Sequence, residues 1–313
     1  MPLPNDEALL ALSQQLLDQF QTIFGEHPGF RPAHAKGIML TGTFEPTAAA
    51  AGVSRAQHLN QPSTPVVVRF SNSTGLPLIP DNDPNANPRG FAIRFMLADH
   101  VHTDIVSHST DGFPTRTGAE FLEFLRALVA SDPAHLDGSP LEAFFGAHPE
   151  ALAFVKTPKP TPASFATDTY FGVTAMKFLT AEGKESFGRY RILPAAGNQY
   201  ADEATLKEKP ADFLMEEIVE RVSKAPVVFQ VQVQLAGEGD VVDDATKHWP
   251  EDRPIVDLGT LTLTAPVEDT AVEQKHIIFD PIPRTDGIEP SDDPLLELRA
   301  AIYLISGRKR RKA

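Results

Sequence analysis

A series of short apolar runs, each bounded by Gly, Pro, Asn or Asp, constrains the fold more than any other feature of this chain. The clearest run is Val227–Leu235, in which every second residue is apolar, as in a strand with one buried face. Similar runs cover residues 38–44, 65–72, 90–97, 103–108, 172–179, 186–193, 259–264 and 276–279. Most are joined by hairpins and short loops. This order predicts an α+β protein: an antiparallel β-barrel of about eight strands with surrounding helices.

Apolar residues at helical spacing appear in three further places. Residues 5–25 predict an amphipathic helix that Asn5 or Asp6 caps and that Gly25 ends. Residues 117–130 predict a second helix, and a third begins near Pro294 and reaches about residue 306, or 310 if the pattern continues. No linker rich in Gly and Ser divides the chain, so we expect one domain over residues 1–313, with the barrel spanning about 31–280.

The charge and the residue usage exclude several classes of function. The net charge of −14 repels phosphate backbones and argues against a nucleic-acid-binding protein. The absence of cysteine excludes disulfides, thiolate nucleophiles, zinc ribbons and a thiolate-ligated haem. The N-terminal stretch has no basic segment followed by an apolar one, and no apolar run approaches the roughly 18 residues of a membrane span. We therefore expect no signal peptide and a cytoplasmic location.

One tyrosine near the end of the chain has two arginines at helical spacing. Arg299 and Tyr303 are four residues apart, and Arg310 lies close to three turns beyond Arg299 if the helix continues. A neighbouring cation favours a phenolate, which is a hard anionic donor suited to ferric iron, and tyrosine is an axial ligand of some haems. The alternative interpretations are a surface tyrosine with ordinary arginine neighbours and a solvated basic tail over residues 308–312.

The histidines give weaker indications. His34 follows Arg31 at the start of a predicted strand, where a histidine usually has a structural role. His100, His102 and His108 have even spacing and would share one strand face, but no carboxylate or cysteine at ligand spacing completes a metal site. The chain also lacks a P-loop, a dinucleotide-binding glycine motif, a nucleophile elbow and the HExxH zinc motif.

Several blocks, in order along most of the chain, resemble the catalase family. They are RPAHAKG at 31–37, VRFSNSTG at 68–75, PRGFAIRF at 88–95, DATKHWP at 244–250, FDP at 279–281, GIEPS at 287–291 and RAAIY at 299–303. Two or three such blocks can arise by chance, whereas this many in one order indicate the family. The resemblance implies haem b as the cofactor and peroxide as the substrate.

The resemblance also implies roles for particular residues. His34 corresponds to the distal base that takes a proton from bound peroxide and returns it to the leaving oxygen. Ser71 would hydrogen-bond this histidine, and Tyr303 would ligate the iron from the opposite side with Arg299 beside it. The remaining positions are expected to contact the haem itself, the arginines at its propionates and the aromatic residues over the ring: Arg31, Arg69, Arg310, Phe113 and Phe121.

Two departures from the family pattern affect the expected reaction. The family places a distal asparagine four residues after the aspartate matched by Asp104, and this chain has His108 there. The asparagine helps to hold the second peroxide during its oxidation to oxygen, so its replacement disfavours dismutation. The chain is also much shorter than typical catalases and shows no basis for bound NADPH. Both features resemble the small catalase-related peroxidases.

We therefore expect a haem peroxidase that reduces hydrogen peroxide or organic hydroperoxides with an external small electron donor, with weak or no dismutation. His108 would supply a hydrogen bond or proton of its own. Two alternatives stay open. One is an isomerase or dehydratase of fatty-acid hydroperoxides, similar to allene oxide synthase, and the other is a haem sensor or store without turnover. Family members generally form oligomers, so we also expect a homo-oligomer.

Overall fold

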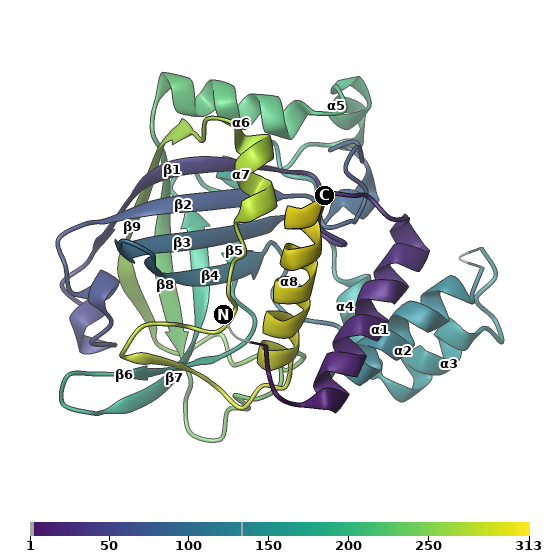
Figure 1. The fold of residues 1–313 in the computed structure, drawn as a ribbon, viewed down its shortest axis with the longest axis horizontal. Helices are drawn as coiled ribbons and strands as arrows, with labels where there is room; N and C mark the ends of the chain where they lie inside the picture. The colour runs from purple at the N-terminus through teal and green to yellow at the C-terminus, as the bar shows by residue number, and fades with distance from the viewer. Residues whose placement is uncertain (1–2, 133) are drawn as a thin grey trace.

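A closed antiparallel barrel forms the body of the protein (Figure 1). The computed structural model describes residues 3–132 and 134–313. Met1 and Pro2, at the start of the N-terminal stretch in which no signal peptide is expected, lie outside the described residues. Eight strands close the barrel in the order β7-β5-β4-β3-β2-β1-β9-β8, with β8 pairing back onto β7. They are β1 (Gly37–Pro46), β2 (Thr64–Ser71), β3 (Gly90–Ala98), β4 (Val101–His108), β5 (Tyr170–Phe171), β7 (Glu185–Pro194), β8 (Val227–Leu235) and β9 (Ile255–Pro266). Two short strands, β6 (Met176–Leu179) and β10 (Ile288–Pro290), extend the sheet beyond β7.

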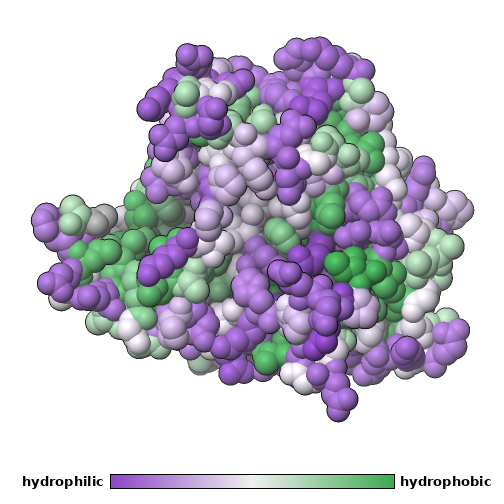
Figure 2. Space-filling model, turned by 180° about the vertical axis from the view of Figure 1, so that it is seen from behind, coloured by the Kyte–Doolittle hydropathy of each residue, from purple (hydrophilic) through white to green (hydrophobic). Residues whose placement is uncertain are grey.

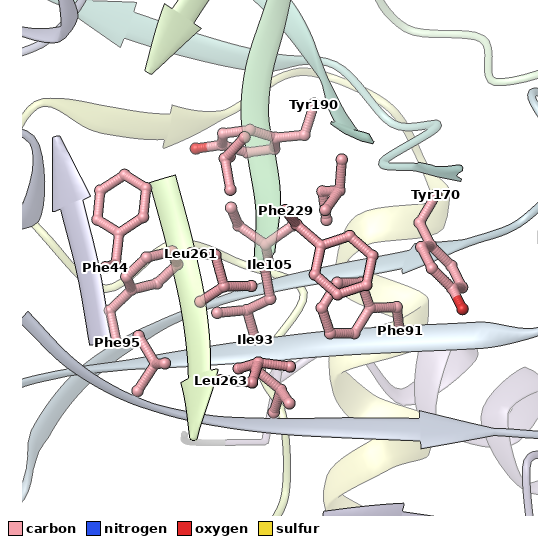
Figure 3. Close-up of a cluster of buried hydrophobic side chains, with 14 of the residues drawn as sticks. Phe44, Phe91, Ile93, Phe95, Ile105, Tyr170, Tyr190, Phe229, Leu261 and Leu263 are labelled. Carbon is pink, nitrogen blue, oxygen red and sulfur yellow. The ribbon is translucent and has the colours of Figure 1, made fainter. Parts of the chain in front are cut away.

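Aromatic and branched side chains fill the barrel (Figure 3). The alternation in β8 has the expected result, because Phe229, Val231 and Val233 are all at most 1% exposed. Phe44 and Phe95 meet edge to face across the interior, with ring centroids 5.1 Å apart. The barrel interior is therefore a packed core.

The helices lie on two sides of the barrel. In Figure 1, α5 (Glu203–Glu208) and α6 (Phe213–Lys224) cross the top, and α8 (Leu295–Lys312) stands between the barrel and α1 (Glu7–Phe24). Beyond α1 lie α2 (Gly118–Val129) and α3 (Pro140–Ala147). Helix α4 (Pro149–Lys156) contacts α3, and α7 (Thr270–His276) lies next to α8. A second apolar cluster joins α1, α2 and α8 through Leu16, Leu122 and Leu298. This cluster fixes α8 against the rest of the molecule.

The eight-strand antiparallel barrel and the three predicted helices are confirmed. Asp6 is the cap of α1, and α8 continues to Lys312, past the shorter limit suggested by the pattern. The predicted strand at 276–279 is wrong: His276 ends α7, and the following residues are irregular. Their carbonyl groups accept hydrogen bonds from arginine side chains, since Ile277 O accepts from Arg31 and Arg310. A strand ladder would have used those acceptors.

Two further differences are instructive. Of the run predicted as one strand at 172–179, only β6, which begins at Met176, is a strand, and the short β5 ends just before the run, at Phe171. The sequence does not predict helices α3 to α7, because their apolar stripes are short or interrupted.

No helix within residues 3–132 or 134–313 is long and apolar enough to cross a membrane. The face seen in Figure 2 is mostly hydrophilic, with separate apolar patches.

Candidate active site

The site is built on one row of directly paired residues across the barrel wall. Ser71 on β2 pairs with Gly90 on β3, and Gly90 pairs with His108 on β4. The row continues to Gly37 on β1 and Phe171 on β5. Directly opposed residues of neighbouring strands point to the same face of a sheet, so Ser71 and His108 flank the side-chain-free position of Gly90.

His34 occupies the space that Gly90 leaves open. A Cβ on Gly90 would lie 2.7 Å from His34 Nδ1 and 2.5 Å from Ser71 Oγ. The imidazole is held there by a 3.1 Å hydrogen bond between His34 Nδ1 and Ser71 Oγ, and by the His34 N–H, which donates to the carbonyl of Ser73 at 3.1 Å. His34 has a φ of 56°, in the left-handed region that few side chains favour. The chain thus turns sharply to place this ring over the row.

Both histidines at this site are held in the neutral form. Burial lowers the pKa of His34 to about 3, and the positive charges of Arg69, Arg31 and Arg299 add to this effect. Burial likewise lowers the pKa of His108 to about 3, with further contributions from His34, Arg299 and Lys159. Nδ1 of His108 is buried and has no hydrogen-bond partner in the described part of the chain. A neutral imidazole can accept a proton, so the pair suits proton transfer to and from a small ligand.

Tyr303 and Arg299 form a second group on α8. Arg299 Nε donates a hydrogen bond to the phenolic oxygen of Tyr303 at 3.2 Å, and the guanidinium lies 5.7 Å from the ring centroid. Tyr303 is partly buried and packs in the apolar cluster that also holds Phe121. The phenolate is the form of tyrosine that binds ferric iron, and Arg299 is placed to hydrogen-bond its oxygen.

Three arginines gather near the C-terminal end of α8. Arg69 and Arg310 are each 4% exposed, and no carboxylate of the described residues lies within salt-bridge distance of Arg31, Arg69 or Arg310. Their partners are mainly backbone carbonyls, such as Ile277 O for both Arg31 and Arg310 and His34 O for Arg69. Burial and the neighbouring arginine charges lower the pKa of Arg31, and burial together with Arg310 lowers the pKa of Arg69 to about 9. Buried like charges require a counter-charge, so this cluster fits a ligand that carries carboxylates, as a haem does.

These groups surround one region. Arg299 on α8 is close enough for its charge to act on both His34 and His108, and Tyr303 is close enough to Arg31 to affect the pKa of that arginine, so the two groups share one region. Phe113 and Phe121 lie beside this region, with ring centroids 5.0 Å apart. Two neutral histidines, a phenol with its arginine and a cluster of buried cations make up the donor set that a tyrosine-ligated haem requires.

The structure thus brings the residues singled out from the sequence into one neighbourhood, and it adds one that the motifs do not single out. Gly90 carries no functional group, yet its missing side chain makes the space for His34. A glycine inside a strand pattern signals close approach by another group, and this signal is present in the PRGF block. The exposed His100 and the partly exposed His102 do not join His108, and no metal-binding group of three histidines or carboxylates occurs among the described residues.

The chain as a whole is similar to several known proteins. A family model described as "Catalase" matches residues 5–312. A catalase-related peroxidase of Mycolicibacterium paratuberculosis is 35% identical over 303 residues, covering 95% of this chain and 94% of that protein. Another catalase-related peroxidase, from Synechococcus elongatus, is 34% identical, with 95% and 88% covered. Among solved structures, catalase A from Saccharomyces cerevisiae superposes with a TM-score of 0.80 at 20% identity, which shows a shared fold. That match covers 94% of this chain and 64% of the yeast protein.

Proposed function

The chain belongs to the catalase family, and we propose that it is a haem peroxidase that reduces hydrogen peroxide or organic hydroperoxides with an external organic reductant. The relatives that match almost the whole chain are named catalase-related peroxidases, which supports an oxidoreductase acting on peroxide. The observation that carries the proposal is the placement of His34 over Gly90, between the paired positions of Ser71 and His108, with Arg299 of the Tyr303 helix close enough to act on both histidines.

Haem, when bound, supplies the iron at which the O–O bond of the peroxide is cleaved and through which electrons arrive. The residues proposed to hold it are Tyr303 as the ligand and Arg31, Arg69 and Arg310 at its propionates. The counter-charge that the arginine cluster requires supports this assignment. The cofactor proposed is haem b, whose two propionates are the carboxylates that such a cluster would pair with. Phe113 and Phe121 would lie against the ring.

His34 is proposed to be the base that takes the peroxide proton. Its Nδ1 is engaged with Ser71, so Nε2 is the nitrogen left for the substrate. The lowered pKa keeps this nitrogen unprotonated at neutral pH, as a base requires. Ser71 positions the ring by fixing Nδ1. The proton then moves from Nε2 to the leaving oxygen.

The reaction requires two electrons and two protons per peroxide. A reductant that gives one electron and one proton, such as a phenol, is consumed in two equivalents, and a hydroperoxide ROOH yields ROH, water and two phenoxyl radicals. His108 replaces the asparagine with which the family holds a second peroxide, and its Nδ1, which has no partner among the described residues, can exchange a proton. We propose that His108 supports reduction by a donor at the expense of dismutation.

One pair of measurements tests the proposal. The purified protein should bind haem and show the absorbance of a tyrosine-ligated ferric haem. With peroxide, it should oxidise a phenolic donor and release little oxygen. A protein that takes up no haem, or whose haem fails to react with peroxide, would refute the proposal. Conversion of a lipid hydroperoxide to an isomer without any reductant would support the isomerase instead. We further propose that the chain acts as one haem-binding domain, in the cytoplasm, and as a homo-oligomer.

A further inference from the structure

An apolar pocket of about 530 Å³ lies between the chain that leads to His34 and the loop that follows β2. Its lining is mainly apolar: Phe30, Leu76, Pro77, Leu78, Ile79 and Pro80, with His27 and Asp83 as the polar members. The volume is within the usual range of small-molecule sites, about 300–1,000 Å³. It is too small for a helix or a strand of a partner, which would need an extended groove.

The exposure of this lining is unusual. The side chain of Leu78 is 89% exposed, Phe30 is 49% exposed and Leu76 is 39% exposed, although they line one pocket. Burying apolar surface stabilises a complex by about 25 cal/mol per Å², so a bound ring would gain from covering these three side chains. Such clustered exposure marks a surface that binds a protein, a membrane or a ligand, and the volume of the pocket favours a small ligand.

The polar members of the lining set the charge of the ligand. Oδ1 of Asp83 accepts hydrogen bonds from the backbone N–H and the side-chain amide of Asn85, and this leaves Oδ2 to accept a hydrogen bond from a ligand. His27 Nε2 is engaged with the carbonyl of Phe24. The described lining contains neither lysine nor arginine, and the chain carries a net charge of −14. A fatty-acid carboxylate would find no cation in this lining, whereas a phenol or an aromatic amine can donate to Asp83.

The pocket and the catalytic histidine share the same two chain segments. His34 N–H donates to Ser73 O, and Ala35 N–H donates to Thr74 O, at 3.1 and 2.9 Å. Gly75 then packs so closely that a Cβ there would lie 2.3 Å from Pro32 O. The pocket lining begins at the next residue, Leu76. The pocket lining is therefore joined, through one short stretch of backbone, to the segment that carries His34.

We propose that this pocket binds the reducing substrate, a small neutral or cationic aromatic molecule such as a phenol or an aromatic amine. The ring would lie against Phe30, Leu76 and Leu78, and its O–H or N–H would donate to Asp83. This inference rests on the proposed peroxidase function, which requires such a reductant but does not say where it binds.

Ligand-observed NMR on the haem-loaded protein tests the pocket with three probes: p-cresol, tyramine and decanoate. Wild type should bind p-cresol and tyramine more tightly than decanoate. Leu78→Asp places a charge in the apolar lining and should weaken p-cresol at least about tenfold. Leu78 is so exposed that the substitution removes no core packing. Val241→Asp adds the same charge at another exposed apolar residue, 41% exposed, and should leave p-cresol binding unchanged.

Asp83→Asn provides the second arm, because asparagine can still cap the short helical turn that Asp83 begins. It should weaken tyramine several-fold and p-cresol less, because both lose the acceptor at Oδ2 and tyramine also loses the carboxylate charge. Three results would each overturn the inference. They are unchanged p-cresol binding in Leu78→Asp, tighter binding of decanoate than of p-cresol, and a dimer that Leu78→Asp dissociates without affecting p-cresol binding. These measurements need no turnover. A haem that does not react with peroxide would refute the peroxidase function, and the binding data would still decide the pocket.

Discussion

Replacing Gly90 by alanine should disable the peroxide reaction while leaving the protein folded. The added Cβ would lie 2.5 Å from Ser71 Oγ and 2.7 Å from His34 Nδ1, both far inside van der Waals contact. Ser71 can rotate away, but this breaks its hydrogen bond to His34, and the imidazole must still shift. A displacement of roughly 1 Å of a positioned catalytic group costs about a hundredfold in rate. We therefore expect the reaction of the haem with peroxide to slow by about 10²-fold or more.

The cost to stability should be modest. Overpacking of this kind costs about 1–3 kcal/mol. With an unfolding entropy of about 2.1 cal/mol/K per residue, a chain of 313 residues loses roughly 1.5 °C in Tm for each kcal/mol, so the Tm should fall by about 2–5 °C. Stopped-flow absorbance at the haem band, with peroxide and no reductant, measures the rate, and a thermal melt measures the Tm.

A matched glycine serves as the control. A Cβ added to Gly146 in α3 would meet no atom within 4 Å, so Gly146→Ala should leave the rate unchanged and the Tm equal or slightly higher. If Gly90→Ala folds, binds haem and reacts with peroxide at the wild-type rate, then His34 does not act from the position over Gly90, and the proposed site is wrong.

Three further predictions follow from the same geometry. His108→Asn should raise oxygen release relative to donor oxidation at least about tenfold, measured with an oxygen electrode, and an unchanged ratio would remove His108 from the choice of reaction. Arg310→Gln should weaken haem binding by about 1.5–3 kcal/mol, or roughly 10- to 150-fold, because one charge-assisted hydrogen bond is lost; haem transfer to apomyoglobin measures it, and equal retention would argue against a propionate contact. The fold holds the pKa of His34, His58 and His108 at about 3, below their ordinary 6.5, so the unfolded chain binds more protons between these values. The free energy of unfolding should be greatest above about pH 6.5 and fall toward pH 3, by on the order of 2 kcal/mol per histidine at pH 5. Urea unfolding at several pH values measures this loss, which would be absent if these histidines were solvated.

The sequence predicts the barrel well because its strands alternate against one packed interior. The bounds predicted for β8, Val227–Leu235, are those observed, since alternation leaves little freedom of register. The segment after His276 shows where such reasoning fails. Its β-branched residues favour a strand, but the arginine side chains that use its carbonyls come from Arg31 and Arg310, far away in the sequence. A local pattern contains no information about partners at that separation.

The candidate site is partly predictable for a similar reason. The face shared by Arg299 and Tyr303 follows from helical spacing, and the hydrogen bond between them is present. That Arg310 is buried, while its neighbours Arg308 and Lys309 are exposed, does not follow from a run of basic residues. The placement of His34 over Gly90 depends on the pairing of β2 with β3 and on a left-handed residue, neither of which the spacing specifies.

The row of Ser71, Gly90 and His108 has a consequence for how such proteins diversify. His108 is the last residue of β4, and one of its two row neighbours, Gly90, has no side chain. An exchange at this position therefore needs little compensation in the barrel core, which is filled from the opposite face of the same strands. With the role proposed for His108, one substitution would change the reaction while the scaffold keeps its stability. In evolutionary terms, selection on the reaction can then act at residue 108 independently of selection on the fold. A laboratory library of substitutions at residue 108 should vary the ratio of donor oxidation to oxygen release without a comparable loss of folded protein.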